Sequence, residues 1–410
     1  MSKTFFVLPN VRTNPYSSTE IEAKHPKPLV HLENMFGHFD DFSLRNFITP
    51  SFIDSVGEDS LVFVVVFIYL PISAEFSLDK KLIKRINKNP NTHLLFISLY
   101  EYRLEIDKLV NECNEKNVRT DKVVLASSNY KSHMTHQAGI RCIYMEHWES
   151  YSRYILKLRD GTGHTNFATR LETIKNANKK FISLNRNVKH HRLWWYFSIC
   201  KNKMMKEGHV SYNLPDVDKK LVKSFLIHPL FTTKLPKHIR KAMSNKDEAL
   251  LMTSKKLDEI DSSQWIINWQ DSISQYYRDS LLSIVTESEE KLAFLTEKTY
   301  KAISHHHPFF IIGNPEHHEI LRKKGYHTFE SLFGINQVTN FDEATLLLDN
   351  LKRLSLKELK NLILEKYKNQ IKENNENYLE RTISWNDVVR DLNNATRRIK
   401  ITDNLRFTVT

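Results

Sequence analysis

The run Thr296-Glu297-Lys298 has the residue types needed to hold a phosphate group. Threonine favours the position before a helix, and the sequence predicts a helix over Leu295–Ser304. The free backbone N–H groups in the first turn of a helix can bind phosphate oxygens. Lys298 adds a positive charge, and Glu297 can accept hydrogen bonds from hydroxyl groups. This segment is therefore the first candidate for a ligand site.

Apolar strands are predicted on both sides of that helix, at Leu281–Val285 and Pro308–Gly313. Strand, helix and strand in this order are typical of a parallel sheet with helical crossovers. Ligands of such sheets bind beyond the carboxyl ends of the strands, beside the starts of the following helices. The predicted elements therefore place Lys298 where a ligand would bind.

A second segment, Lys179–His191, repeats this order with more positive charge. Its predicted strand, Lys180–Leu184, leads into a basic loop, and a helix is predicted over Arg192–Lys206. Arginine binds phosphate through two parallel N–H groups. Arg186 lies in this loop, and Arg192 begins the predicted helix.

The first segment resembles the donor-binding motif of the α1,3-fucosyltransferase superfamily. In that motif Thr-Glu-Lys-x-Tyr-x-Ala lies between an acidic stretch and a small apolar strand. The resemblance implies that five side chains face the donor nucleotide: Glu287, Thr296, Glu297, Lys298 and Tyr300. Ile303–Pro308 departs from the pattern, because histidines stand where the family usually has small residues.

The second segment is similar to one in phage-encoded and bacterial glycosyltransferases of the same superfamily, and the resemblance covers residues 178–375. It implies that Arg186 and Arg192 contact the donor diphosphate. It also implies an α/β fold of the GT-B type, with two Rossmann-like domains facing a cleft and a C-terminal helical extension. The donor would be a nucleoside-diphosphate sugar, linked to UDP or GDP, with no obligatory metal.

The sequence predicts an N-terminal Rossmann-like acceptor domain over 1–165 and a C-terminal nucleotide-sugar domain over 166–340. A helical tail, 341–410, is expected to pack back on both. The elements predicted in the first domain are the strands Leu61–Ile72, Leu94–Leu99, Lys122–Ala126 and Ile140–Tyr144 and the helices Asp79–Lys88 and Arg103–Glu115. The apolar run Leu61–Ile72 is too short to cross a bilayer as a helix, so no transmembrane segment is expected.

An inverting sugar transfer needs a general base to deprotonate the acceptor hydroxyl. We expect this base to be a carboxylate of the first domain, close to the end of a strand. The candidates are Asp40, Asp41, Glu101 and Glu149, with Glu146 beside the last of them. Adjacent histidines point in different directions and rarely form one metal site, and no Asp-x-Asp motif is present. We therefore predict no metal.

Positive charge is concentrated between Arg170 and Ile260, where 20 Lys and Arg face 8 Asp and Glu. This stretch accounts for the whole net charge of +12. Such a stretch attracts phosphate-bearing partners, whether nucleotide, nucleic acid or anionic lipid. A solvated lysine-rich surface is the alternative explanation.

The resemblance to phage transferases implies duplex DNA as one acceptor, because T-even-type phages attach sugars to 5-hydroxymethylcytosine. The sugar would be arabinose or a hexose. The alternatives are a surface-glycan or lipopolysaccharide transferase, and a nucleic-acid-binding protein built on a decayed transferase fold. Three cysteines without metal-ligand spacing indicate a reducing compartment, so we expect a cytoplasmic protein, in the host if it is phage-encoded.

Overall fold

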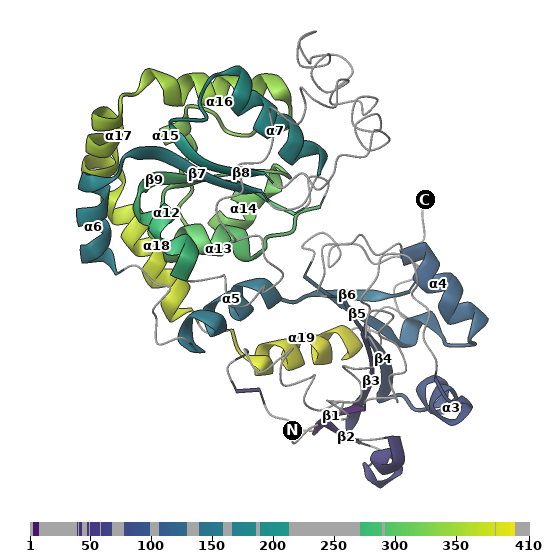
Figure 1. Cartoon of the computed structure of the whole chain (residues 1–410). Coiled ribbons are helices and arrows are strands. Elements are labelled where there is room, and N and C mark those ends of the chain that lie inside the picture. The colour runs from purple at the N-terminus through teal and green to yellow at the C-terminus, as the bar shows by residue number, and fades with distance from the viewer. Residues whose placement is uncertain are drawn as a thin grey trace, which may run out of the picture. The chain divides into compact units, whose positions relative to one another are not determined.

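A computed structural model describes residues 3–7, 39, 41–42, 47–48, 50–57, 59–67, 78–98, 106–128, 139–158, 166–185, 189–212, 271–288, 292–381 and 383–397. The chain divides into two compact units. The N-terminal unit is Met1–Tyr151 together with Thr382–Thr410, and the C-terminal unit is Ser152–Arg381. Each unit is built around its own parallel sheet (Figure 1).

The N-terminal unit has a six-stranded sheet in the order β2-β1-β3-β4-β5-β6, and every pair of neighbouring strands is parallel. The strands are β1 (Thr4–Val7), β2 (Phe47–Ile48), β3 (Leu61–Phe67), β4 (Thr92–Ser98), β5 (Val123–Ser127) and β6 (Arg141–Tyr144). The helices are η2 (Pro50–Ser55), α3 (Lys80–Lys88), α4 (Ile106–Glu115), η3 (Thr120–Lys122), α5 (His147–Leu158) and α19 (Trp385–Arg397).

Both faces of this sheet are covered, as its continuous apolar strands require. On one face Ile86 of α3 and Leu109 of α4 belong to a single buried cluster with the strand residues. On the other face Trp385 and Leu392 of α19 pack into a second cluster with Phe63 of β3. Figure 1 shows α3 and α4 on one side of the sheet and α19 on the other. The last described helix of the chain therefore completes the core of the first unit.

The C-terminal unit has a four-stranded parallel sheet in the order β10-β9-β7-β8. Its strands are β7 (Lys179–Asn185), β8 (Gly208–Tyr212), β9 (Ser280–Thr286) and β10 (Phe309–Ile312). Its helices are α6 (Phe167–Asn176), α7 (His190–Lys201), α12 (Asp271–Arg278), α13 (Glu297–Ser304), α14 (Glu316–Lys323), α15 (Glu330–Phe333), α16 (Phe341–Arg353), α17 (Leu356–Leu362), the π-helical turn η6 (Ile363–Tyr367) and α18 (Lys368–Glu380).

The strand order of the C-terminal sheet reverses between β7 and β9. From β7 the chain runs through α7 to β8 on one side, and it later runs from β9 through α13 to β10 on the other. The helices α7 and α13 therefore leave neighbouring strands in opposite directions. In open α/β sheets this arrangement opens a crevice at the carboxyl ends of the two strands, where ligands bind.

The histidines that depart from the family pattern are part of the core of the C-terminal unit. His306 lies in the left-handed region at φ 53°, which histidine tolerates better than most residues. His307 is buried, and its Nδ1 lies 2.9 Å from the Ser283 hydroxyl of β9. His305 stacks on Tyr277 with ring centroids 4.3 Å apart. The histidines therefore connect α13 to β10 by filling space and hydrogen bonding inside the fold.

The predicted fold class is confirmed: two Rossmann-like α/β units are followed by C-terminal helices. Three details differ from the prediction. The units divide after Tyr151 instead of after residue 165, and the tail is shared, since α16 to α18 belong to the C-terminal unit and α19 to the N-terminal one. The helix predicted over Arg192–Lys206 ends at Lys201, because Lys203 adopts a left-handed conformation at φ 59°.

Candidate functional site

The candidate site lies at the carboxyl ends of β7 and β9, where the strand order reverses. The last residues of the two strands are joined directly, because the Thr286 hydroxyl hydrogen-bonds to the Asn185 side-chain oxygen. Both residues are about 1% exposed, so this bond is shielded from water. The starts of α7 and α13 are thereby held beside one another at the same edge of the sheet.

The start of α13 is formed as the sequence predicts. Thr296 is the N-cap, and its hydroxyl accepts a hydrogen bond from the Lys298 backbone N–H. The Lys298 ammonium lies 3.0 Å from the Ser288 hydroxyl, 3.2 Å from the Thr296 hydroxyl and 2.9 Å from a Glu297 carboxylate oxygen. Its side chain is 27% exposed, so a ligand can reach it. Lys298 is thus a positive charge held at a helix N-terminus.

Glu297 is kept ionised by its neighbours. Burial by itself would raise the pKa of this carboxyl, but Lys298 and Lys301 outweigh burial, and the pKa is lowered overall. Burial also lowers the pKa of Lys301 to about 8, although Glu297 opposes this. Glu297 is therefore an anionic acceptor at neutral pH, suited to hydroxyl groups of a ligand.

Glu287 does not face outward, contrary to the prediction from the motif. Its side chain is completely buried, and its carboxylate accepts hydrogen bonds from four groups inside the fold. The donors and distances are the Ser288 N–H (3.2 Å), the Thr296 N–H (3.1 Å), the Thr296 hydroxyl (2.6 Å) and the Thr299 hydroxyl (2.6 Å). The carboxylate already accepts these four hydrogen bonds, so Glu287 stabilises the start of α13 from inside the fold.

Tyr300 is also a core residue, where the motif implied a residue facing the nucleotide. It is 1% exposed and stacks on Tyr378 of α18, with ring centroids 5.9 Å apart and planes 14° apart. Its hydroxyl accepts a hydrogen bond from the Lys324 ammonium at 3.2 Å. The face of α13 that carries Tyr300 packs against α18, and this packing turns the side chain away from the crevice.

The start of α7 is basic, and its N-cap, Lys189, makes no side-chain capping hydrogen bond in the described part of the chain. The first turn of α7 contains no acidic residue. Lys189 donates to the Ser288 carbonyl, and His191 Nε2 lies 2.7 Å from the Glu287 carbonyl. Since α7 has no carboxylate at its start, its first N–H groups are suited to an anion.

The two predicted arginines have different outcomes. Arg186 lies outside the described residues. Arg192 is 2% exposed, and its guanidinium donates to the carbonyls of Thr286 (3.3 Å) and Glu287 (3.2 Å). Arg192 therefore ties α7 to the end of β9 through its Nη2.

Of the four predicted general bases, the structure describes Asp41 and Glu149. Asp40 and Glu101 lie outside the described residues, and Glu149 is buried in the first turn of α5. Asp41 accepts hydrogen bonds from the Trp385 N–H at 2.8 Å and the Ser384 hydroxyl at 2.7 Å, at the start of α19. Asp41 caps a helix, so its geometry does not favour it as the base.

Three residues of the site were missed from the sequence, namely Asn185, Lys189 and Ser288. Lys189 belongs to the basic loop, and Ser288 directly follows Glu287, so both lay beside recognised residues. The bond between Asn185 and Thr286 joins positions 101 apart in the chain. No local spacing rule predicts such a pair.

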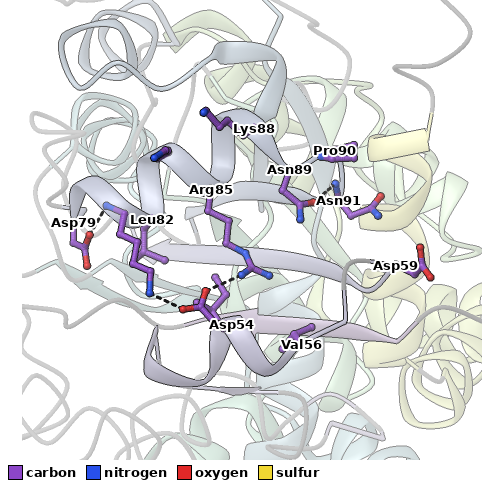
Figure 2. Close-up of a pocket in the computed structure, with 13 residues that line it drawn as sticks. Asp54, Val56, Asp59, Asp79, Leu82, Arg85, Lys88, Asn89, Pro90 and Asn91 are labelled. Carbon is purple, nitrogen blue, oxygen red and sulfur yellow. Dashed lines mark hydrogen bonds and ion pairs between the residues drawn. The ribbon is translucent and has the colours of Figure 1, made fainter.

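A groove of about 690 Å³ lies in the N-terminal unit, between α3, the turn η2 and the start of β4 (Figure 2). Its lining includes none of the predicted site residues. Asp54 forms ion pairs across it with Lys81 (2.5 Å) and Arg85 (3.1 Å). The groove meets β4 at Asn91, at the amino end of the strand. It is therefore at the edge of its sheet opposite the one where α/β proteins bind ligands.

Within the described ranges, no helix combines the length and apolar character that a membrane span requires. Within the same ranges, no group of three or more His, Cys, Asp or Glu side chains is placed to hold a metal ion.

No protein-family model matches the chain, and no curated protein matches it. Among solved structures, the chain is similar to the crystal structure of α,α-trehalose 6-phosphate synthase from Burkholderia multivorans. The TM-score is 0.41 at 10% sequence identity, and the alignment covers 100% of both chains. Similarity at this level transfers no activity to this chain. The likeness to the α1,3-fucosyltransferase superfamily therefore depends on the motif residues alone.

Proposed function

We propose that this protein is a glycosyltransferase whose C-terminal unit binds a nucleoside-diphosphate sugar at the β7/β9 crevice. One observation carries the proposal: α7 and α13 both begin there, and basic side chains mark both starts. Lys298 supplies a partly exposed ammonium at one helix start. The start of α7 has no acidic residue in its first turn. Two helix N-termini and a lysine make a site for a diphosphate.

This arrangement matches the main electrostatic demand of sugar transfer. As the bond from the sugar to the diphosphate breaks, negative charge builds up on the departing nucleoside diphosphate. Fixed N–H groups and an oriented ammonium stabilise that charge without reorganising during the reaction. Glu297, ionised beside them, would accept from ribose hydroxyls. Arg186 is proposed as a further phosphate ligand, from the motif. The base of the nucleotide, uracil or guanine, stays open.

For the acceptor we propose duplex DNA containing 5-hydroxymethylcytosine, with arabinose or a hexose as the transferred sugar. The support is the basic stretch between Arg170 and Ile260 and the likeness of Lys179–His191 to phage transferases. The target base would have to leave the helical stack, and phosphate contacts would supply most of the affinity. A carboxylate of the N-terminal unit would act as the base, and Glu149 is the described candidate. A surface glycan is the competing acceptor, with the basic stretch then touching anionic lipid.

The deciding experiment incubates the protein with DNA containing 5-hydroxymethylcytosine and a panel of UDP- and GDP-linked sugars. We expect a mass gain of one sugar per modified base with at least one donor, and a clearly slower gain with Lys298→Ala. Release of nucleoside diphosphate without a gain on DNA, together with sedimentation on anionic vesicles, would favour the glycan acceptor. Absence of both donor binding and donor turnover across the panel would refute the glycosyltransferase proposal.

A further inference from the structure

We propose that Glu287 is a positioning residue that orients the Lys298 ammonium through the Thr296 hydroxyl. The inference extends the proposed function, because it names what fixes the charge that would hold the diphosphate. Glu287 itself is fully buried, so its side chain is not accessible to a ligand. It acts through the residues above it.

The hydroxyl of Thr296 can donate only one hydrogen, and it donates it to Glu287 at 2.6 Å. Its lone pairs are then left to accept, and Lys298 donates to them from two groups. The backbone N–H of Lys298 lies at 3.4 Å and its ammonium at 3.2 Å. Without an acceptor at Glu287, the hydroxyl could turn its hydrogen towards the ammonium, and this would repel Lys298. The carboxylate therefore keeps the hydroxyl hydrogen of Thr296 directed away from Lys298 and the hydroxyl lone pairs directed towards it.

Glu287 also connects the two helix starts through its main chain. Its carbonyl accepts from His191 of α7 at 2.7 Å and from Arg192 at 3.2 Å. Its backbone N–H donates to the Ile312 carbonyl at 3.1 Å and continues the pairing of β9 with β10. The residue that orients Lys298 is thus fixed by the neighbouring strand and by α7. The position of its main chain is therefore set at the end of β9, where the strand order reverses, and not by the loop that follows β9.

The carboxylate is held by neutral donors. Across the described ranges no side-chain cation forms an ion pair with Glu287, and its four donors are N–H and hydroxyl groups. The adjacent N-terminus of α13 favours the negative charge. Glutamine has the same shape, but its amide nitrogen donates where the carboxylate accepts. In Glu287→Gln one accepting oxygen is thus replaced by a donating amide group, while the volume of the side chain is kept.

The first test measures Lys298 itself and needs no ligand. Wild-type protein and Glu287→Gln are treated with acetic anhydride, and the acetylation of Lys298 is followed by mass spectrometry relative to Lys323. Lys323 lies on α14 with 54% of its side chain exposed, and it serves as the internal reference. We expect Lys298 to react about fivefold faster in the variant, the equivalent of one lost hydrogen bond. An unchanged ratio in a folded variant overturns the proposal.

A matched control distinguishes a loss of Lys298 orientation from a general loss of stability in β9. Ser283→Ala removes a buried hydrogen bond from the same strand, where the hydroxyl lies 2.9 Å from His307. It should lower stability as Glu287→Gln does and leave Lys298 reactivity as in wild type. If Ser283→Ala accelerates Lys298 equally, Glu287 acts only through stability and the proposal fails.

The second test is a double-mutant cycle on binding of UDP and GDP by titration calorimetry. Glu287→Gln should weaken binding about tenfold in the wild-type background and clearly less in the Lys298→Ala background, because the two residues act as one unit. Equal losses in both backgrounds contradict the inference. If wild type binds neither nucleotide, the proposed function fails, and Lys298 acetylation still decides the role of Glu287.

Discussion

The Lys298 ammonium lies 3.0 Å from the Ser288 hydroxyl. The first turn of α13 is therefore bonded to the start of the loop that follows β9. Lysine at this place holds three oxygen acceptors and keeps 27% of its side chain exposed. Phosphate oxygens can therefore replace a hydroxyl partner without the side chain having to move far. The proposed site would thus be formed in advance of binding, which lowers the entropic cost of ordering it.

Lys298→Ala is expected to weaken binding of UDP or GDP by about tenfold to a hundredfold, the range for one hydrogen bond to a charged group. The side chain is partly exposed, so the fold should survive. Titration calorimetry gives the affinity, and circular dichroism checks the fold.

The matched control for that lysine is Lys323→Ala. Lys323 is exposed and forms an ion pair with Glu319, one turn away, at 2.7 Å. Its removal should leave the affinity within about twofold, as for surface ion pairs of this kind. A similar loss in both variants would mean that the overall charge, and not the site, attracts the nucleotide.

Tyr300→Ala should lower the free energy of unfolding by about 3–5 kcal/mol, as for other large buried rings. The ring is 1% exposed and stacks on Tyr378. Tyr300→Phe keeps the ring and loses the bond to Lys324, so about 1 kcal/mol is expected. Denaturant unfolding measures both. A tenfold drop in nucleotide affinity for Tyr300→Phe would restore the role that the motif implied.

Asp41→Ala should destabilise the protein by about 1 kcal/mol, the usual loss for a helix N-cap. The carboxylate accepts from Trp385 and Ser384 at the start of α19, whose apolar face completes the core of the N-terminal unit. Chemical denaturation measures the change, and nucleotide binding should not respond. Asp54→Ala, which breaks exposed ion pairs with Lys81 and Arg85, is the control and should cost less.

Stability should fall on acidification below about pH 6.5 because His317 is buried and neutral. Burial lowers its pKa from 6.5 to about 3, so below pH 6.5 only the unfolded chain takes up the proton. The contribution of His317 is complete above pH 6.5 and is lost towards pH 3, by about 1.4 kcal/mol per pH unit.

The measurement is the unfolding free energy at pH 7, 6 and 5. His317→Gln can still accept the hydrogen bond from the Phe294 N–H, which reaches His317 Nε2 at 3.0 Å in the wild type. Its stability should depend on pH less steeply than that of the wild type. Identical slopes would show that His317 is protonated in the fold.

The sequence by itself determined the local elements. Short apolar runs such as Leu281–Val285 predicted strands, and β9 extends that run by one residue at each end. Asp79 and Thr296 marked helix starts, and both are N-caps in the structure. These features depend on neighbouring residues in the chain, so periodicity and capping chemistry are sufficient to find them.

Only the tertiary structure decided which motif residues are exposed. Glu287, Thr296, Lys298 and Tyr300 share one motif, yet Glu287 and Tyr300 are buried and Lys298 is partly open. Burial depends on α18 and on β7, which lie far from the motif in sequence. The role of Asp41 at the start of α19 depends on a contact between positions 344 apart. Contacts of this range follow from the packing of whole elements, which no spacing within the sequence specifies.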